Sequence, residues 1–195
     1  MRALTLLPLL LLAACMRAPE PPRITPTSPH GSMPPMAGGE AAPAPEASSG
    51  IHFPEPEGWT PSDRQIMFAE KVWDLPGGGG ASLSVVGGSV EANLARWSGP
   101  SQFQFPDGRT EENFREKTIE DGNFPVRMVV MKGTLVATKL VGGGPPREGW
   151  TMVGAAVTDA LPGGRAIYLK VAGPSDEMEA QIPAIEEALR GIEVH

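Results

Sequence analysis

EGWTMVGAAVTDALPGGRAIYLKVAGPS, residues 148–175, predicts two strands, the tight turn between them and the start of a helix. The strands cover Thr151–Thr158 and Ala166–Val171, and Leu161-Pro162-Gly163-Gly164 separates them. Glycine adopts the positive φ values that hairpin turns need, and Ser175 is a suitable N-cap because its hydroxyl can accept a hydrogen bond from a free amide of the helix start. The stretch therefore predicts an antiparallel hairpin followed by a helix.

The same order of elements is predicted earlier in the chain, where EGWT and LPGG recur. The predicted elements there are a strand over Arg64–Asp74, a strand over Ala81–Val86 and a helix over Val90–Trp97 with Ser89 as its N-cap. The spacing between EGWT and LPGG is 14 residues in this first unit and 9 in the second. A true structural repeat and a second, independent use of common turn chemistry are both compatible with the pattern.

Two further strands and a C-terminal helix complete the predicted fold. The alternation over Phe114–Glu120 is weak, which is typical of an edge or exposed strand, whereas the apolar run within Pro125–Leu135 indicates a central strand covered on both faces. The last helix is predicted over Asp176–Arg190, with a kink or a restart at Pro183 because proline removes a helical hydrogen bond. The fold class is therefore α+β, a mostly antiparallel sheet of about six or seven strands with helices packed on it.

Several stretches of residues 51–195 carry a resemblance to known proteins. They are Phe53–Trp59, Glu91–Trp97 (EANLARW), Phe105–Gly108 (FPDG), GWTMVGAAV from Gly149 and AIYLKVAGP from Ala166. These stretches resemble uncharacterised exported bacterial domains, which are similar in turn to the PsbP-like α/β/α sandwich, named for an extrinsic subunit of photosystem II. The resemblance implies this sandwich fold, but it matches no functional residue of the photosystem subunit and implies no role in photosynthesis.

The N-terminus has the three-part pattern of an exported protein. Its parts are the charged Met1-Arg2, the apolar Leu4–Leu12, and the small residues Ala13 and Ala14 before Cys15, the only cysteine of the chain. The apolar run is about a dozen residues long, shorter than the ~20 that a membrane-spanning helix needs. Leu12-Ala13-Ala14-Cys15 resembles the lipobox of a bacterial lipoprotein, which predicts removal of residues 1–14 and lipidation of Cys15.

The anchor predicts a location in the bacterial cell envelope, on the membrane that holds the lipidated cysteine. Met16 stands where the inner-membrane retention signal of enteric lipoproteins has aspartate, which favours the outer membrane, facing the periplasm. Residues 15–50 hold nine prolines and four glycines but no Phe, Trp or Tyr, and this composition predicts a disordered tether. All aromatic residues lie in residues 51–195, which predicts a single α+β globular domain there.

No chemistry-bearing motif follows the anchor. The formal net charge of −7 disfavours nucleic acid as a partner, and the three histidines, His30, His52 and His195, have no second ligand at a metal-binding spacing. Gly87-Gly88-Ser89-Val90-Glu91 lacks the final glycine of a GxSxG nucleophile motif, and no glycine run is followed by the Lys-Ser or Lys-Thr of a P-loop. The sequence therefore predicts no catalytic residue, cofactor or metal, and no enzymatic activity.

Trp59 and Trp150 share the EGWT context and are the aromatic pair open to a functional interpretation. The favoured interpretation is that both pack in the core. The alternative places them at the rim of a groove, where an indole can stack on a sugar or hold a partner, with the loop 142–148 as its gate. The candidate groove then consists of Trp59, Trp150, Gly143 and Arg147.

These observations leave three hypotheses for the function. The leading one is a non-enzymatic envelope lipoprotein, attached to the membrane by its lipid, whose domain binds an envelope protein or a cell-wall component or stabilises an assembly. The alternative is a module that binds a glycan or a small apolar ligand near Trp59 and Trp150. A cell-wall hydrolase comes last, because no nucleophile, metal set or base is marked.

Overall fold

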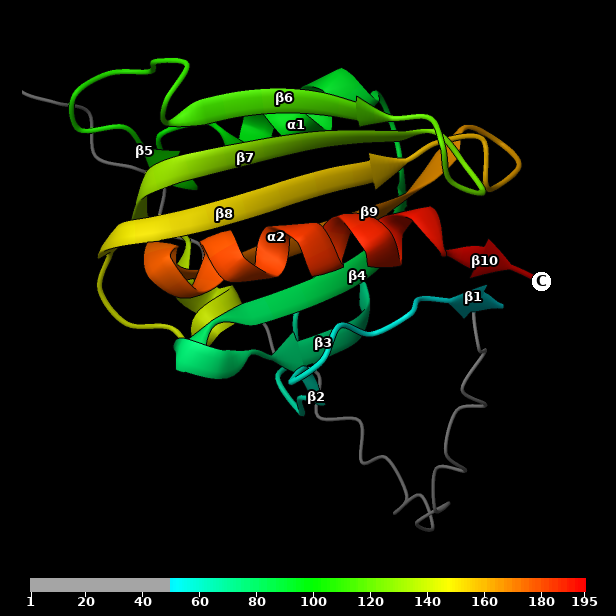
Figure 1. Ribbon diagram of the computed structural model, residues 1–195, viewed down its shortest axis with the longest axis horizontal. Helices are drawn as coiled ribbons and strands as arrows, with labels where there is room; N and C mark the ends of the chain where they lie inside the picture. The colour runs from blue at the N-terminus through cyan, green and yellow to red at the C-terminus, as the bar shows by residue number, and fades with distance from the viewer. Residues whose placement is uncertain (1–49) are drawn as a thin grey trace, which may run out of the picture. The chain divides into compact units, whose positions relative to one another are not determined.

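The computed structural model describes residues 50–195, in which helices lie on both faces of one antiparallel sheet (Figure 1). Its strands are β2 (Thr60–Pro61), β3 (Ala69–Asp74), β4 (Gly80–Gly87), β5 (Phe103–Gln104), β6 (Phe114–Ile119), β7 (Val126–Leu135), β8 (Arg147–Val157) and β9 (Arg165–Pro174). Their order across the sheet is β2-β3-β4-β9-β8-β7-β5, and β6 also pairs with β7. The predicted α+β class, an antiparallel sheet with helices packed on it, is confirmed.

The two main helices cover opposite faces of this sheet, which are called the α1 face and the α2 face below. α1 (Val90–Trp97) lies behind β6 and β7 in Figure 1, and α2 (Ser175–Arg190) lies in front of the sheet. Successive strand side chains point to opposite faces, so Val153 and Ala155 of β8 belong to the core under α2, whereas Met152 belongs to the core under α1. The central strands are therefore buried on both sides, as the apolar run within residues 125–135 predicted.

The sheet has eight strands rather than six or seven because β2 and β5 are only two residues long. A strand of two residues is too short to show the alternation of polar and apolar side chains from which a strand is predicted. β3 begins at Ala69, so the predicted start at Arg64 is wrong. A turn intervenes: the Ala69 N–H donates to the Ile66 carbonyl at 3.0 Å, and Phe68 has a positive φ of 63°.

The two helix starts differ in how they are capped. The Ser89 hydroxyl accepts a hydrogen bond from the Ala92 N–H at 3.3 Å, which confirms the predicted cap of α1. The prediction that Ser175 caps the second helix is wrong, because α2 begins at Ser175 itself and its hydroxyl lies 2.9 Å from that of Thr151.

Of the predicted kink or restart at Pro183, the restart does not occur, because α2 continues through this residue. Proline within a helix costs about 3 kcal/mol. Met178 precedes it and Ile185 and Leu189 follow it, and all three are buried in the core of the α2 face. Packing on both sides of the proline therefore keeps the helix in one piece.

The two hairpin units do not form a structural repeat. Strand, turn, strand and helix recur in the same order, with the short 3₁₀ helix η1 (Pro76–Gly78) in the first turn. The inner strands β4 and β9 are antiparallel neighbours, and a two-fold axis relating them would be perpendicular to the sheet and place both helices on one face. Because α1 and α2 lie on opposite faces, the shared sequence signals reflect common turn chemistry.

The first and last strands of the described residues pair with each other. β1 (Ile51–His52) is antiparallel to β10 (Glu193–Val194), and the His195 N–H donates to the Gly50 carbonyl at 2.8 Å. The described part of the chain thus begins and ends at the same place. Neither helix within residues 50–195 is both long and apolar enough to span a bilayer.

Candidate functional site

Three of the four predicted groove residues lie together, where β8 follows the 3₁₀ helix η2 (Thr138–Val141). Arg147 Nη2 donates to the carbonyls of Val141 and Gly143, at 3.0 and 3.2 Å. The guanidinium of Arg147 lies 4.7 Å from the ring centroid of Trp150, which is only 8% exposed. The guanidinium of Arg147 therefore already has structural partners, because it hydrogen-bonds to the glycine loop and covers a buried indole.

Trp59 lies on the other face of the sheet. Its indole N–H donates to Gln181 Oε1 at 2.8 Å, and its ring centroid is 5.6 Å from that of Trp73. Trp59 is 6% exposed and belongs to the core under α2, whereas Trp150 belongs to the core under α1. No single groove within residues 50–195 contains both indoles.

The backbone conformation before β8 accounts for the run of glycines there. Gly142, Gly143 and Gly144 have φ values of 87°, 82° and 99°, in the region that favours glycine. The Gly143 N–H donates to the Thr138 carbonyl at 2.8 Å, and the Thr138 hydroxyl donates to the Gly144 carbonyl at 2.8 Å. These bonds tie the predicted gate to η2, so the conformation of the loop explains the glycines without a ligand.

The strand β6 has an open edge. Within residues 50–195 it pairs only with β7, and four of its six side chains, Arg115 to Thr118, are exposed. The Lys132 N–H donates to the Asn113 carbonyl at 2.8 Å, which turns the main-chain groups of Asn113 toward β7. With the two-residue period of an antiparallel ladder, the main-chain N–H and C=O of Glu116 and Thr118 then point to the open side.

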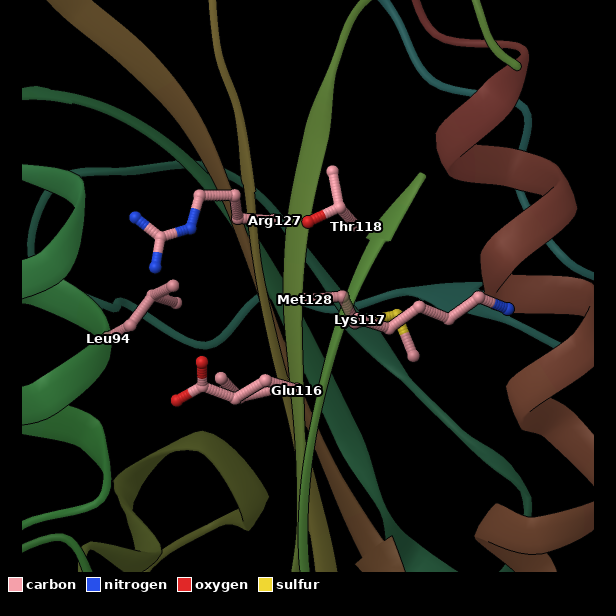
Figure 2. A pocket seen from close by; sticks show the side chains of 7 residues that line it. Leu94, Glu116, Lys117, Thr118, Arg127 and Met128 are labelled. Atoms are coloured by element: carbon pink, nitrogen blue, oxygen red, sulfur yellow. The ribbon is translucent and has the colours of Figure 1, made fainter. Parts of the chain in front are cut away.

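A groove lies beside β6 on the α1 face and is called the α1-side groove. It combines two adjoining hollows of about 140 and 230 Å³ that share Leu94, Glu116, Arg127 and Val129 in their lining. Figure 2 shows the side chains of Leu94, Glu116 and Arg127 on the side of α1. Phe114 lines the second hollow, with the guanidinium of Arg109 3.1 Å from its ring centroid. The floor is apolar and the rim is charged.

A second groove lies beside β6 on the α2 face and is called the α2-side groove. Its two hollows, of about 300 and 320 Å³, share Arg115 and Ile182. In Figure 2 the Lys117 side chain points toward α2, away from Glu116. β6 therefore has a groove on each face, and its successive side chains point alternately into them.

Each groove has an ion pair at its rim. On the α1 side Arg127 pairs with Glu91, and on the α2 side Lys132 pairs with Glu179. Hydrogen bonds from its own backbone amide and from the Ser89 hydroxyl, with the charge of Arg127, lower the pKa of Glu91. The hydrogen bond from Lys132 lowers the pKa of Glu179. Each groove thus presents both signs of charge, which suits a polypeptide better than a simple anion or cation.

One half-buried cation lies away from these grooves. Lys170 of β9 lies on the α1 face, where its amine donates to Gln102 Oε1 at 2.8 Å and lies 5.9 Å from the ring centroid of Trp97. Burial, with a smaller effect of the Arg96 charge, lowers the pKa of Lys170 to about 8. A lysine with such a pKa is a recognised mark of functional sites, but none of the hollows described above reaches it.

The residues considered for catalysis have structural contacts. The hydroxyl of Ser89 caps α1 and donates to Glu91 at 2.8 Å. Within residues 50–195, no three histidine, cysteine or acidic side chains are grouped so that they could hold a metal ion. Cys15, with the predicted signal peptide and tether, lies outside the described residues.

Two bacterial proteins are among the solved structures to which this chain is similar. One is the cyanobacterial PsbP (CyanoP) from Synechocystis sp. PCC 6803, with a TM-score of 0.48, 10% identity, and coverage of 76% of this chain and 89% of that chain. The other is LpqN of Mycobacterium tuberculosis, described as involved in cell envelope biogenesis, with a TM-score of 0.42, 15% identity, and coverage of 74% and 82%. Identities this low transfer no function to this chain. The chain matches no protein-family model, and the comparison with curated proteins gave no match.

The sequence predicted the exposed strand at the edge of the sheet, but it did not predict the grooves beside it. The weak alternation of residues 114–120 indicated an exposed strand. Glu91 and Arg127, which form the rim of the α1-side groove, are 36 residues apart and share no motif. Lys170 did leave a signal, since it is the one charged residue within AIYLKVAGP.

Proposed function

We propose that this chain is a lipid-anchored lipoprotein of the bacterial cell envelope whose domain binds a polypeptide partner along β6. The observation that carries the proposal is the open edge of β6 with a groove on each face. An exposed strand edge is a template for another strand, and flanking pockets give such pairing its specificity.

The anchor in this proposal is Cys15, on the basis of its lipobox-like context in the sequence. Lipidation would hold the domain at a membrane surface, with the outer membrane, facing the periplasm, favoured by Met16. Radiolabelled fatty acid tests this step, because label should enter the chain and be absent after Cys15→Ser.

Binding is proposed to occur by strand addition. A partner segment in extended conformation pairs with the outward N–H and C=O groups of Glu116 and Thr118. Its side chains then alternate between the α1-side groove and the α2-side groove, because side chains of a strand alternate between faces. The smaller hollow of the α1-side groove accepts apolar groups against Leu94 and Val129. The rims of the α1-side and α2-side grooves offer charges of either sign to the partner.

Thr118→Pro tests this mode of binding with little change elsewhere. Proline removes the outward N–H, whereas the pairing of Lys117 and Ile119 with β7 stays available. Thr118→Val is the matched control, because it keeps the N–H and a similar shape. The lipidated chain, with a photo-crosslinker at Arg115, should trap an envelope protein, and Thr118→Pro should reduce the yield at least tenfold while Thr118→Val does not. Equal yields from the two variants would exclude strand addition at this edge.

The proposed role is non-enzymatic. It places binding at β6 and assigns no bond-making or bond-breaking step to any residue of the domain. Zymography on peptidoglycan with the lipidated chain addresses this directly, since a clearing zone that the chain produces would contradict the proposal.

A further inference from the structure

Met67 and Phe68 form an apolar tip at the edge of the sheet opposite β6. Their exposures are 80% and 71%, the highest among the large apolar side chains of residues 50–195. The tip directly precedes β3, and Figure 1 shows β2 and β3 on the far side of the sheet from β6. Neither of the proposed binding grooves includes these residues.

The turn that carries the tip holds both side chains outward. The Ala69 N–H donates to the Ile66 carbonyl at 3.0 Å, which closes a four-residue turn, and Ile66 is half-buried against the core of the α1 face. Phe68 occupies the third position with a φ of 63°, where glycine is the usual residue. A bulky residue in this conformation is strained, and such strain is a mark of functional positions.

We propose that Met67 and Phe68 insert into the lipid bilayer to which the chain is anchored. The inference rests on the anchor at Cys15 in the proposed function. Two side chains offer far less area than the ~800 Å² per partner of a stable protein interface, so a protein partner for the tip alone is disfavoured. An anchored domain needs only a weak second contact, because the anchor raises its effective concentration at the bilayer.

The charges around the tip specify the kind of lipid contact. Asp63 and Glu70 are exposed beside it, and Arg64 is paired with Asp74. Within the described residues no cluster of unpaired basic side chains lies beside the tip to attract anionic lipids. The contact is therefore apolar, and zwitterionic lipids suffice. With the tip in the bilayer, β6 lies at the edge of the sheet that faces away from it and is free to pair.

A thiol-reactive fluorophore tests the inference, because Cys15 is the only cysteine and is consumed by lipidation. Met67→Cys then provides one free thiol for an environment-sensitive dye in the full lipidated chain, reconstituted in phosphatidylcholine–phosphatidylethanolamine vesicles. The emission should shift to shorter wavelength and be quenched by nitroxide-labelled lipid, and raising the salt concentration should leave the shift unchanged. Glu111→Cys, at an exposed position, is the matched control and should show neither effect.

The outcomes separate this inference from the proposed function. A chain that does not stay with the vesicles contradicts the anchor. An anchored chain whose dye at position 67 emits like the dye at position 111 overturns the insertion of the tip. Protection of position 67 only after addition of solubilised envelope proteins would also overturn it, in favour of a protein contact.

Discussion

The two edges of the sheet differ in length and in what they expose. At one edge β2 is two residues long and ends with Pro61, which has no N–H to donate, and the apolar tip follows. At the other edge β6 is six residues long, with charged side chains and outward main-chain groups. The first edge is therefore closed to strand pairing and the second is open, so the proposed bilayer contact and a strand partner can be held at the same time.

The closed edge is also expected to be the more firmly built. Trp73 of β3 is 1% exposed and contacts the rings of Phe53 and Trp59, whereas Phe114 of β6 is half-buried. Trp73→Ala should lower the free energy of unfolding by about 3–5 kcal/mol, and Phe114→Ala by roughly half as much. Urea denaturation of the chain carrying Cys15→Ser measures both changes in the free energy of unfolding. A larger loss for Phe114→Ala would contradict the firmer packing of the closed edge.

Lys170 lies on a central strand, and its effect on stability tests whether the strands between the two edges form an apolar core. Its pKa of about 8 lies below the ordinary 10.5, so burial disfavours the charged form in the folded protein. The unfolded chain binds more protons between these two values, so this penalty is complete below pH 8 and disappears as the pH rises through 10.5. The shift corresponds to about 3 kcal/mol.

Lys170→Met should therefore raise the free energy of unfolding by up to about 3 kcal/mol at pH 7, with the gain shrinking toward pH 10. Urea denaturation at both pH values measures the gain. Lys139→Met, at an exposed position of η2, is the matched control and should change stability little at either pH. A gain of equal size at pH 7 and pH 10 would show that better packing, not the charge, is responsible.

Phe68 is expected to limit stability at the closed edge. Phe68→Gly should raise the free energy of unfolding by about 1 kcal/mol, because glycine adopts a φ of 63° without strain. Phe68→Ala removes the ring but keeps the strain and should give no gain. If Phe68→Gly instead destabilises the protein, the ring is packed rather than held outward. Thermal denaturation distinguishes these results.

The centre of the sheet was predictable from the sequence, and its edges were predictable only in part. Continuous apolar runs mark β7 and β9 because burial on both faces removes the polar alternation. The two-residue strand β5 pairs with Leu135 and Thr134 through contacts that no local pattern encodes. The alternative interpretation, a groove at Trp59 and Trp150, rested on a shared EGWT motif, yet the motif places one indole in the core of each face. Which face a residue takes depends on strand register, and register is set by pairing between distant segments.

Removal of the charges of β6 tests the difference between the two edges with the smallest expected change in stability. Arg115 and Lys117 point to the α2 side, and Lys117 pairs with Glu186 at 2.6 Å. Exposed ion pairs contribute about 0–1 kcal/mol, so Arg115→Thr with Lys117→Thr should change the free energy of unfolding by less than about 1 kcal/mol. The same double substitution should increase self-association, because charged side chains on an edge oppose pairing between two copies of it.

Sedimentation velocity of the chain carrying Cys15→Ser measures this association, and addition of Thr118→Pro to the double variant should abolish it. That reversal would show that the copies meet through the outward main-chain groups of β6. If the double variant associates no more than the parent chain, charge does not keep the edge free, and the shape of the two grooves must select the partner. The strand that binds β6 would then have to fill both grooves before its main chain could pair, which makes side-chain fit the first requirement for binding.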